Sequence, residues 1–237
     1  MARIKERIRL NKYIAKSGIY SRRQADTLIF DGLVKINGKF IQDPSVKVDP
    51  DIDIISVNDV ELNVGKEIFI KFYKPVDVLS SYVSQGCKRN LTDYEPFNKF
   101  RLSYAGRLDY KSEGLMFFCN DGDLIERLLL PENHVEKEYL VYVDRYLSEK
   151  DLIMLQKGIT IAGVNYKECK IIKNNRLAYK VLIHEGKKRQ IRKMFKYCSV
   201  NVIRLIRVRI GPILLGDLKP GEYKNLDKHE LRGVKNV

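Results

Sequence analysis

The residues best suited to chemistry lie between two glycines near the middle of the chain. Residues 105–115 read Ala-Gly-Arg-Leu-Asp-Tyr-Lys-Ser-Glu-Gly-Leu, a polar stretch that runs into an expected strand. An ionised aspartate in such a place is able to act as a covalent nucleophile. A loop aspartate more often makes local hydrogen bonds within a turn. Asp109 is therefore a candidate whose role depends on the rest of the chain.

A second group of candidates lies in residues 186–209, which hold nine Lys or Arg and no acid. The spacing predicts a helix with an apolar face made of Ile191, Met194, Phe195 and Cys198. Cations fall on another face, at Arg189, Arg192, Lys193 and Lys196. The apolar face would anchor the helix and leave the cations to meet a carboxylate or a polyanion. The alternative, a solvated helix face, suits Lys196 better than Arg192.

Composition and charge indicate a folded protein with a polyanionic partner. The chain has 237 residues with 44% hydrophobic residues, and 44 Lys and Arg against 30 Asp and Glu give a net charge of +14. Such an excess favours nucleic acid, through release of counterions from the phosphate backbone. An anionic membrane is the rival, but no apolar run reaches the roughly 18 residues of a membrane span. The start of the chain also lacks a secretory signal, so we expect a cytoplasmic protein with no membrane contact.

Metal, disulfide and nucleotide sites are not expected. The four cysteines form no Cys-x-x-Cys pair and the three histidines are scattered, which argues against a zinc site or a disulfide framework. Neither G-x-x-x-x-G-K-[ST] nor G-x-G-x-x-G occurs. The sequence therefore predicts no cofactor and no bound nucleotide.

The N-terminal residues predict a compact helical unit with a basic surface. Leu10, Tyr13 and Ile14 have helical spacing, and Ser17-Gly18 is a typical helix stop. Ser21 with Gln24 three residues later forms a capping-box pattern for a second helix. Arg22 and Arg23 lie in its first turn, where positive charge opposes the helix dipole, so phosphate binding is a reason for their presence. Strands are expected at 33–36, 39–41 and 52–57, with turns at Asn37-Gly38 and Asn58-Asp59.

This unit resembles the α-L RNA-binding domain first described in a small-subunit ribosomal protein. The resemblance is carried by Arg-Leu-Asn-Lys-Tyr-Ile at 9–14, Ser-Arg-Arg-Gln-Ala at 21–25 and Gly-Leu-Val-Lys-Ile-Asn-Gly at 32–38. It implies that the helices present basic side chains to structured RNA. The candidates for RNA contact here are Arg9, Lys12, Arg22 and Arg23.

The remaining chain predicts an α+β domain on a mixed, mainly antiparallel sheet flanked by helices. Strands are expected at 68–73, 115–119, 139–143, 178–184 and 202–209, and the strand at 139–143 reads as buried on both faces. Helices are expected at 121–130, ended by Pro131, and from Ser148 onwards. Strands and helices alternate without a strict βαβ repeat, which favours this fold class. We place the domains at residues 1–64 and 65–237.

Several motifs of this second domain resemble the RsuA/RluB/RluF-type ribosomal RNA pseudouridine synthases. They are Gly-Arg-Leu-Asp at 106–109, Ser-Glu-Gly-Leu at 112–115, Asn-Asp-Gly-Asp-Leu at 120–124, Glu-Lys-Glu-Tyr-Leu-Val at 136–141, residues 185–195 and residues 204–211. Long motifs in the expected order are far more specific than a single glycine pattern. An α-L domain ahead of the catalytic domain also fits this family.

The resemblance implies isomerisation of uridine to pseudouridine in ribosomal RNA, on a nucleotide flipped out of its helix. It implies Asp109 as nucleophile, Arg192 as its salt-bridge partner and Tyr139 as the ring that stacks on the base. It also implies Arg107 as the arginine that fills the space of the flipped nucleotide. Lys188, Arg189 and Lys193 would contact RNA. Whether Asp109 attacks the base or the sugar stays open.

Two other functions stay open beside this one. A non-catalytic RNA-binding or ribosome-assembly protein would keep the fold without turnover, although the set of Asp109, Tyr139 and Arg192 favours an enzyme. A glycosidase using Asp109 and Glu113 is a poorer alternative, because tryptophan is absent and the +14 charge suits an anionic substrate. For the enzyme, the partner would be ribosomal RNA or an assembling subunit, with a slight preference for the large subunit, and the chain is expected to be a monomer.

Overall fold

The computed structural model describes residues 7–64, 67–175 and 177–237. The chain packs as two compact units. The first comprises Met1–Ile68, Glu95–Ser103 and Cys119–Gly122, and the second comprises Phe69–Tyr94, Tyr104–Phe118 and Asp123–Val237. The domain boundary predicted after residue 64 stays a prediction, because residues 65 and 66 lie outside the described part of the chain.

The first helix of the first unit ends, and the second helix begins, where the sequence predicts. Helix α1 (Leu10–Lys16) ends before Gly18, whose φ of +75° suits glycine. Helix α2 (Arg22–Phe30) begins after Ser21, whose hydroxyl accepts the Gln24 N–H, while the Gln24 side chain accepts the Ser21 N–H. This reciprocal cap satisfies two backbone donors that would otherwise lack a partner.

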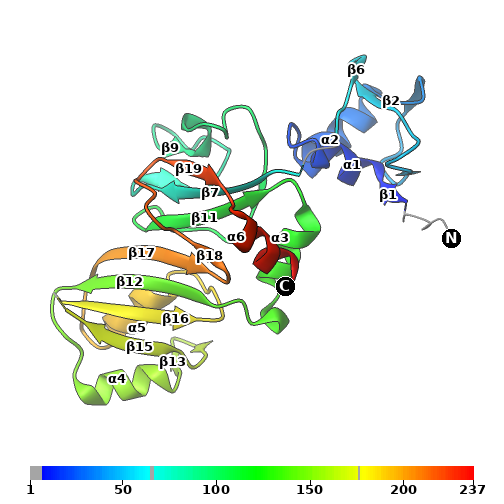
Figure 1. Ribbon diagram of the computed structural model, residues 1–237. Helices are drawn as coiled ribbons and strands as arrows, with labels where there is room; N and C mark the ends of the chain where they lie inside the picture. Colours follow the sequence, from blue (N-terminus) through cyan, green and yellow to red (C-terminus); the bar gives the residue numbers. More distant parts are fainter. Residues whose placement is uncertain (1–6, 65–66, 176) are drawn as a thin grey trace. The chain divides into compact units, whose positions relative to one another are not determined.

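Short strands complete the first unit (Figure 1). They are β1 (Ile8–Arg9), β2 (Val34–Ile36), β3 (Lys39–Ile41), β4 (Lys47–Val48), β5 (Ile55–Val57) and β6 (Val60–Glu61). Strand β5 begins three residues later than predicted, because Asp49 and Asp53 bind the backbone of the turn that precedes it. The core of the unit gathers apolar residues from both helices and from the strands, namely Leu10, Ile14, Ala25, Ile29, Val34, Val48 and Ile55.

The second unit is built on a large sheet with the strand order β15-β16-β12-β17-β11-β7-β19, and β10 and β18 pair at its sides. The strands are β7 (Phe69–Lys74), β10 (Ser103–Tyr104), β11 (Glu113–Cys119), β12 (Lys137–Val143), β15 (Lys170–Asn174), β16 (Ala178–Ile183), β17 (Val202–Ile210), β18 (Ile213–Leu214) and β19 (Tyr223–Asn225). Strands β11 and β17 run parallel, while β12 is antiparallel to both β16 and β17. The fold is therefore the predicted α+β class with a mixed, mainly antiparallel sheet.

The second unit also contains helices, a small parallel strand pair and a small antiparallel hairpin. The helices are α3 (Gly122–Leu129), α4 (Glu149–Gln156), α5 (Gln190–Tyr197) and α6 (Lys228–Lys235), with 3-10 turns η1 (Leu91–Asp93) and η2 (Pro131–Asn133). The remaining strands are the parallel pair β8 (Val78–Leu79) with β9 (Arg89–Asn90) and the antiparallel hairpin β13 (Ile159–Ile161) with β14 (Val164–Tyr166). Ser148 caps α4 by accepting the Asp151 N–H, as predicted. Within the described residues, no helix has the length and apolar character needed to cross a membrane.

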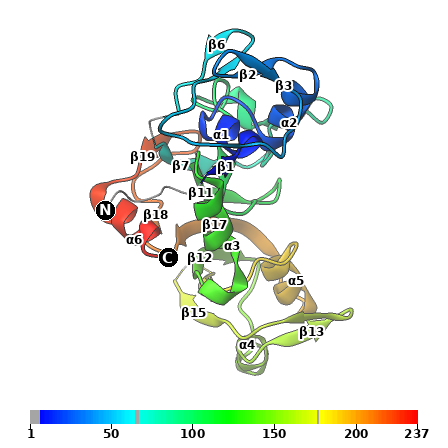
Figure 2. The same cartoon turned by 90° about the vertical axis from the view of Figure 1, so that its right-hand side faces the viewer.

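Strand β12 shows which face of the sheet is covered. Its residues alternate between buried and half-buried, so the prediction that it is buried on both faces is wrong. Helix α5 covers one face, where the ring of Phe195 packs edge-on against Tyr179 with 5.6 Å between ring centres. Figure 1 shows α5 beside the strands β12 and β16, and Figure 2 shows it beside β17. The opposite face carries ion pairs such as Glu138 with Lys180, which keep it polar.

Candidate active site

The loop that carries Asp109 is fixed to its surroundings by backbone hydrogen bonds. The Ser80 hydroxyl donates to the Leu108 carbonyl and accepts the Leu108 N–H, at 2.8 and 3.1 Å. The Asp77 N–H donates to the Tyr110 carbonyl. Asp109 is half-buried, and its carbonyl accepts the Ser112 N–H at 2.9 Å. The backbone on both sides of the carboxylate is therefore held in place.

Arg192 joins α5 to this loop through the backbone. Its guanidinium donates to the Lys111 carbonyl at 2.7 Å and to the Val202 carbonyl at 2.8 Å. Burial lowers the pKa of Arg192, Arg189 lowers it further, and the charge of Asp109 opposes both effects. Asp109 and Arg192 therefore interact electrostatically.

The salt bridge expected between Asp109 and Arg192 is not formed as predicted. No ion pair within 4.0 Å links the two among the described residues, because the Nη atoms of Arg192 are bound to carbonyl oxygens instead. The Nε atom of Arg192 is buried and has no hydrogen-bond partner among those residues. The arginine thus holds the position of the loop and acts on the Asp109 carboxylate through space.

Tyr139 lies on the face of the sheet that α5 covers. It pairs with Val181 on β16 and with Arg207 on β17, so these side chains share one face. The next inward residue, Val141, pairs with Tyr179, which contacts α5 through Phe195. Only 7% of Tyr139 is exposed.

The same face holds three buried cations that the sequence did not single out: Lys74, Lys137 and Arg207. Burial lowers the pKa of Lys74 to about 8, with Asp77, Glu113 and Asp109 opposing the shift. Burial and the neighbouring Arg207 lower the pKa of Lys137. The sequence contained a signal for the burial of Arg207. Arg207 and Leu205 occupy alternate positions of one strand, so their side chains share its inward face.

Glu113 belongs to the opposite face and has a structural partner. Its carboxylate accepts the Tyr73 hydroxyl at 2.8 Å and the Arg204 Nε–H at 2.6 Å. Burial raises the pKa of Glu113, but the hydrogen bonds from Arg204 and Tyr73 outweigh burial and hold it below the usual value. A glycosidase acid needs a raised pKa. The glycosidase alternative that pairs Asp109 with Glu113 is therefore not supported.

The other candidates of the second unit are exposed cations. Arg107 lies two residues before Asp109 in the same loop, and Lys188, Arg189 and Lys193 lie at the start of α5. Ile191, Met194 and Phe195 of α5 are buried, so the predicted apolar and cationic faces of this helix are confirmed. Among the described residues these cations form no ion pair with an acidic side chain, so they are available to phosphates.

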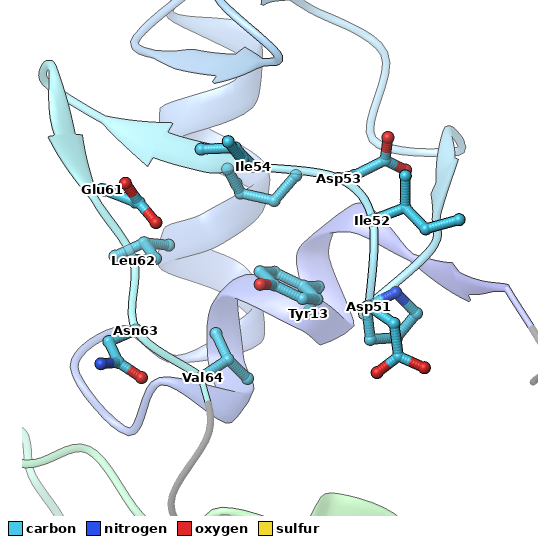
Figure 3. A pocket seen from close by; sticks show the side chains of 11 residues that line it. Tyr13, Asp51, Ile52, Asp53, Ile54, Glu61, Leu62, Asn63 and Val64 are labelled. Carbon is cyan, nitrogen blue, oxygen red and sulfur yellow. The ribbon is translucent and has the colours of Figure 1, made fainter.

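In the first unit, three of the four candidates are fully exposed. Arg9, Arg22 and Arg23 are exposed, whereas Lys12 is half-buried. The unit also has a hollow of about 430 Å³ beside Tyr13 with acidic residues in its wall (Figure 3). Burial raises the pKa of Tyr13, and Glu61 and Asp53 raise it further. Negative charge there repels phosphate, so the helix start at Arg22 is the better RNA contact.

No group of three His, Cys, Asp or Glu is placed to bind a metal ion within the described residues. The described cysteines are all free thiols, Cys87, Cys119, Cys169 and Cys198. Burial raises the pKa of Cys119 to about 12 and that of Cys169 to about 11, so neither thiol is prone to ionise near neutral pH.

Comparison with known families assigns both parts of the chain. Residues 68–197 match the RNA pseudouridylate synthase family, and residues 8–54 match the S4 domain. The second match is the RNA-binding domain expected at the N-terminus, and the first covers the Asp109 loop, Tyr139 and Arg192. The resemblances stated from the sequence motifs are thereby confirmed at the level of family.

Characterised and solved relatives agree. The chain is 37% identical to the dual-specificity RNA pseudouridine synthase RluF of Escherichia coli K12, over 94% of this chain and 77% of that protein. It is 32% identical to the ribosomal large subunit pseudouridine synthase B of Bacillus subtilis, over 96% and 95% of the two chains. A crystal structure of a pseudouridylate synthase superposes with a TM-score of 0.68 at 29% identity, covering 96% and 99%. The chain is therefore a member of the RNA pseudouridylate synthase family.

Proposed function

We propose that this enzyme converts uridine to pseudouridine in ribosomal RNA, with Asp109 as the nucleophile. The observation that carries the proposal is the fixed Asp109 loop, which Arg192 ties to α5 on the sheet face that holds Tyr139. A carboxylate, an aromatic ring and cations thus surround a region of one sheet face. These are the groups that hold, attack and release a flipped pyrimidine.

The reaction is an isomerisation and balances without a co-reactant. The bond between N1 and C1′ breaks, a bond between C5 and C1′ forms, C5 loses a proton and N1 gains one. The Asp109 carboxylate forms a transient covalent bond that holds one fragment while the other turns. Attack on the base and attack on the sugar both satisfy this balance. The Tyr139 ring stacks on the base, and its hydroxyl is suited to assist removal of the C5 proton.

We propose large-subunit ribosomal RNA as the substrate. The Bacillus relative is named for the large ribosomal subunit, while the Escherichia relative is named as dual-specific. The S4 domain supplies an RNA-binding module that suits either large-subunit or small-subunit RNA. We further propose that the protein acts in the cytoplasm as a monomer, on free RNA or on an assembling subunit, with Arg107 filling the space that the flipped nucleotide leaves.

Tritium release from uridine labelled at C5 tests this function. Unmodified large-subunit and small-subunit RNA would be incubated with the wild-type protein, and release is expected from the large-subunit RNA. Release from small-subunit RNA alone would overturn the choice of subunit but not the activity. The protein could instead bind both RNAs without releasing tritium from either RNA or from assembling ribosomal particles. That result would favour a non-catalytic RNA-binding protein.

A further inference from the structure

The guanidinium of Arg207 is a buried charged group with an unsatisfied nitrogen atom. The residue is 2% exposed and is among the largest fully buried side chains of the described chain. Its Nε–H donates to the Leu115 carbonyl at 2.7 Å, whereas Nη2 is buried with no hydrogen-bond partner among the described residues. A buried cation without a partner is costly, so it persists where something else requires it.

No carboxylate lies within ion-pair distance of Arg207 in the described part of the chain. Arg207 acts electrostatically on two other cations, because it lowers the pKa of both Lys74 and Lys137. By contrast, Arg204 and Arg209 on the same strand are paired with Glu113, Glu136 and Glu138. The strand therefore neutralises its outward arginines and leaves its inward arginine unpaired.

The position of Arg207 places its charge inside the proposed uridine site. It is the cross-strand neighbour of Tyr139, and the side chains of such pairs leave Cβ atoms only about 5 Å apart. On the other side, its Nη1 would lie 3.7 Å from a Cβ added to Gly106, in the loop that leads to Asp109. The guanidinium is thus bordered by the residue proposed to stack on the base and by the loop of the nucleophile.

We infer that Arg207 stabilises the negative charge that develops on the uracil ring when its bond to the ribose breaks. This inference rests on the proposed function. When the N1–C1′ bond breaks, the electron pair stays with the ring and spreads from N1 to O2 and O4. A positive charge shielded from water stabilises such an anion strongly and needs no rearrangement at the moment of reaction. Lys137 and Lys74 on the same face add to this positive potential.

Arg207 acts on the ring through its field, because the guanidinium is closed off from solvent in the free protein. It is therefore a positioning residue for charge and not the group that attacks. Asp109 has its own cation in Arg192, whose pKa responds to the Asp109 charge. The two arginines thus have different roles: Arg192 interacts with the Asp109 carboxylate, and Arg207 stabilises the negative charge on the departing base.

The variant Arg207→Met tests the inference. Replacing a buried ion with an apolar side chain of similar volume is often neutral or stabilising, so the variant should fold with an unchanged or higher Tm. Its single-turnover rate on uridine RNA should fall about a hundredfold, with RNA affinity nearly unchanged. Arg207→Lys keeps the positive charge, so its single-turnover rate should fall less than that of Arg207→Met. Arg209→Gln, an outward arginine of the same strand, is the matched control and should keep the wild-type rate.

A leaving-group comparison separates this role from a structural one. Fluorine at C5 withdraws electrons and stabilises the uracil anion, so 5-fluorouridine RNA depends less on a protein cation. Mass spectrometry of digested RNA would follow loss of each nucleoside, and the defect of Arg207→Met should be at least about threefold smaller on 5-fluorouridine RNA. Equal defects on both substrates, a wild-type rate, or a variant that fails to fold would each overturn the inference.

The acid limb of the pH-rate profile gives one more readout. A shift of that limb in Arg207→Met, with equal defects on both RNAs, would mean that the charge acts on Asp109, and the inference would fail. Wild-type protein is assayed first on uridine RNA. Absence of turnover there would refute the proposed function itself, which is a different outcome from an active wild type with an unaffected Arg207 variant.

Discussion

At the scale of single residues, the Asp109 carboxylate interacts with nearby cations but forms no direct ion pair with any described residue. It influences the pKa of Arg192 and of Lys74, yet it forms no ion pair within 4.0 Å among the described residues. Its neighbour in the motif, Glu113, is fully engaged with Arg204 and Tyr73. A carboxylate that the fold leaves unbound is available for bond formation.

Asp109→Asn should abolish turnover while leaving RNA affinity within about twofold of wild type. The amide keeps the size of the side chain but cannot act as a nucleophile. Tritium release and filter binding on the same RNA would measure both quantities. Asp217→Asn, which removes an exposed carboxylate paired with Lys224, is the control and should keep full activity. Turnover retained by Asp109→Asn would exclude the assigned role.

At the scale of elements, the join between β11 and β17 decides the geometry of the site. The two strands pair at only two positions, Glu113 with Ile206 and Gly114 with Arg207. The Arg204 side chain strengthens this short parallel ladder, because it binds Glu113 across the join. Because the Asp109 loop enters β11 at this join, the same contacts set where the Asp109 side chain lies.

Glu113→Gln should lower the free energy of unfolding by about 1 to 2 kcal/mol at pH 7, since Arg204 is half exposed and solvent weakens the pair. The folded pKa of Glu113 is lowered, so its stabilisation is present above the ordinary glutamate value of 4.5 and is lost as pH falls through the folded value. Urea titrations should therefore show the difference at pH 7 and show it disappear as the pH falls below the folded pKa.

The exposed pair of Glu95 and Lys99 provides the control for that measurement. Glu95→Gln should leave the free energy of unfolding nearly unchanged at pH 7 and at acidic pH. A Glu113→Gln variant that behaved like this control would show that the contact across the join contributes nothing to stability.

Gly114→Ala should be strongly destabilising, by at least about 3 kcal/mol. Gly114 has a φ of +105°, and an added Cβ would lie 2.3 Å from the Arg207 carbonyl oxygen, so the two strands would have to separate. Gly38→Ala also places alanine at positive φ, but nothing lies within 4 Å, and it should cost about 1 kcal/mol. Thermal unfolding of both variants would measure the contrast, and equal losses would contradict the tight approach of β11 and β17.

At the scale of the whole molecule, the net charge of +14 is distributed unevenly. The second unit presents exposed cations at the start of α5, and the first presents them at the start of α2. The first unit also carries an acidic wall around the hollow beside Tyr13. We expect RNA to bind to the basic surfaces and to avoid this wall, which gives the S4 domain a defined binding side.

Changing Arg22 and Arg23 together to Ala should weaken RNA binding and lower the slope of log K against log salt by about 2. Each arginine is exposed and has no acidic partner within the described residues, so each is able to neutralise one phosphate. Lys35→Ala is the control, because Lys35 already pairs with Asp59 in the same unit. An unchanged slope for the double variant would rule out this helix start as the RNA contact.

The amino-acid sequence by itself determined the elements and the family. The Ser21 capping box, the Asn37-Gly38 turn and the two faces of α5 all appear as predicted, because each depends on residues close together in the chain. Asp109, Tyr139 and Arg192 could be proposed because the motifs around them are contiguous, although their roles stay predictions.

Only the tertiary structure decided the partners of the charged groups. Arg192 binds the Lys111 carbonyl and not the Asp109 carboxylate, and β12 is covered on one face only. Likewise, Glu113 is held by Arg204 while Arg207, three residues later, is left unpaired under the Asp109 loop. These contacts join residues about ninety positions apart, and local propensity carries no information about which of several cations meets which acid. Pairing across the sheet sets that choice, because strand register fixes the face and the neighbour of each side chain.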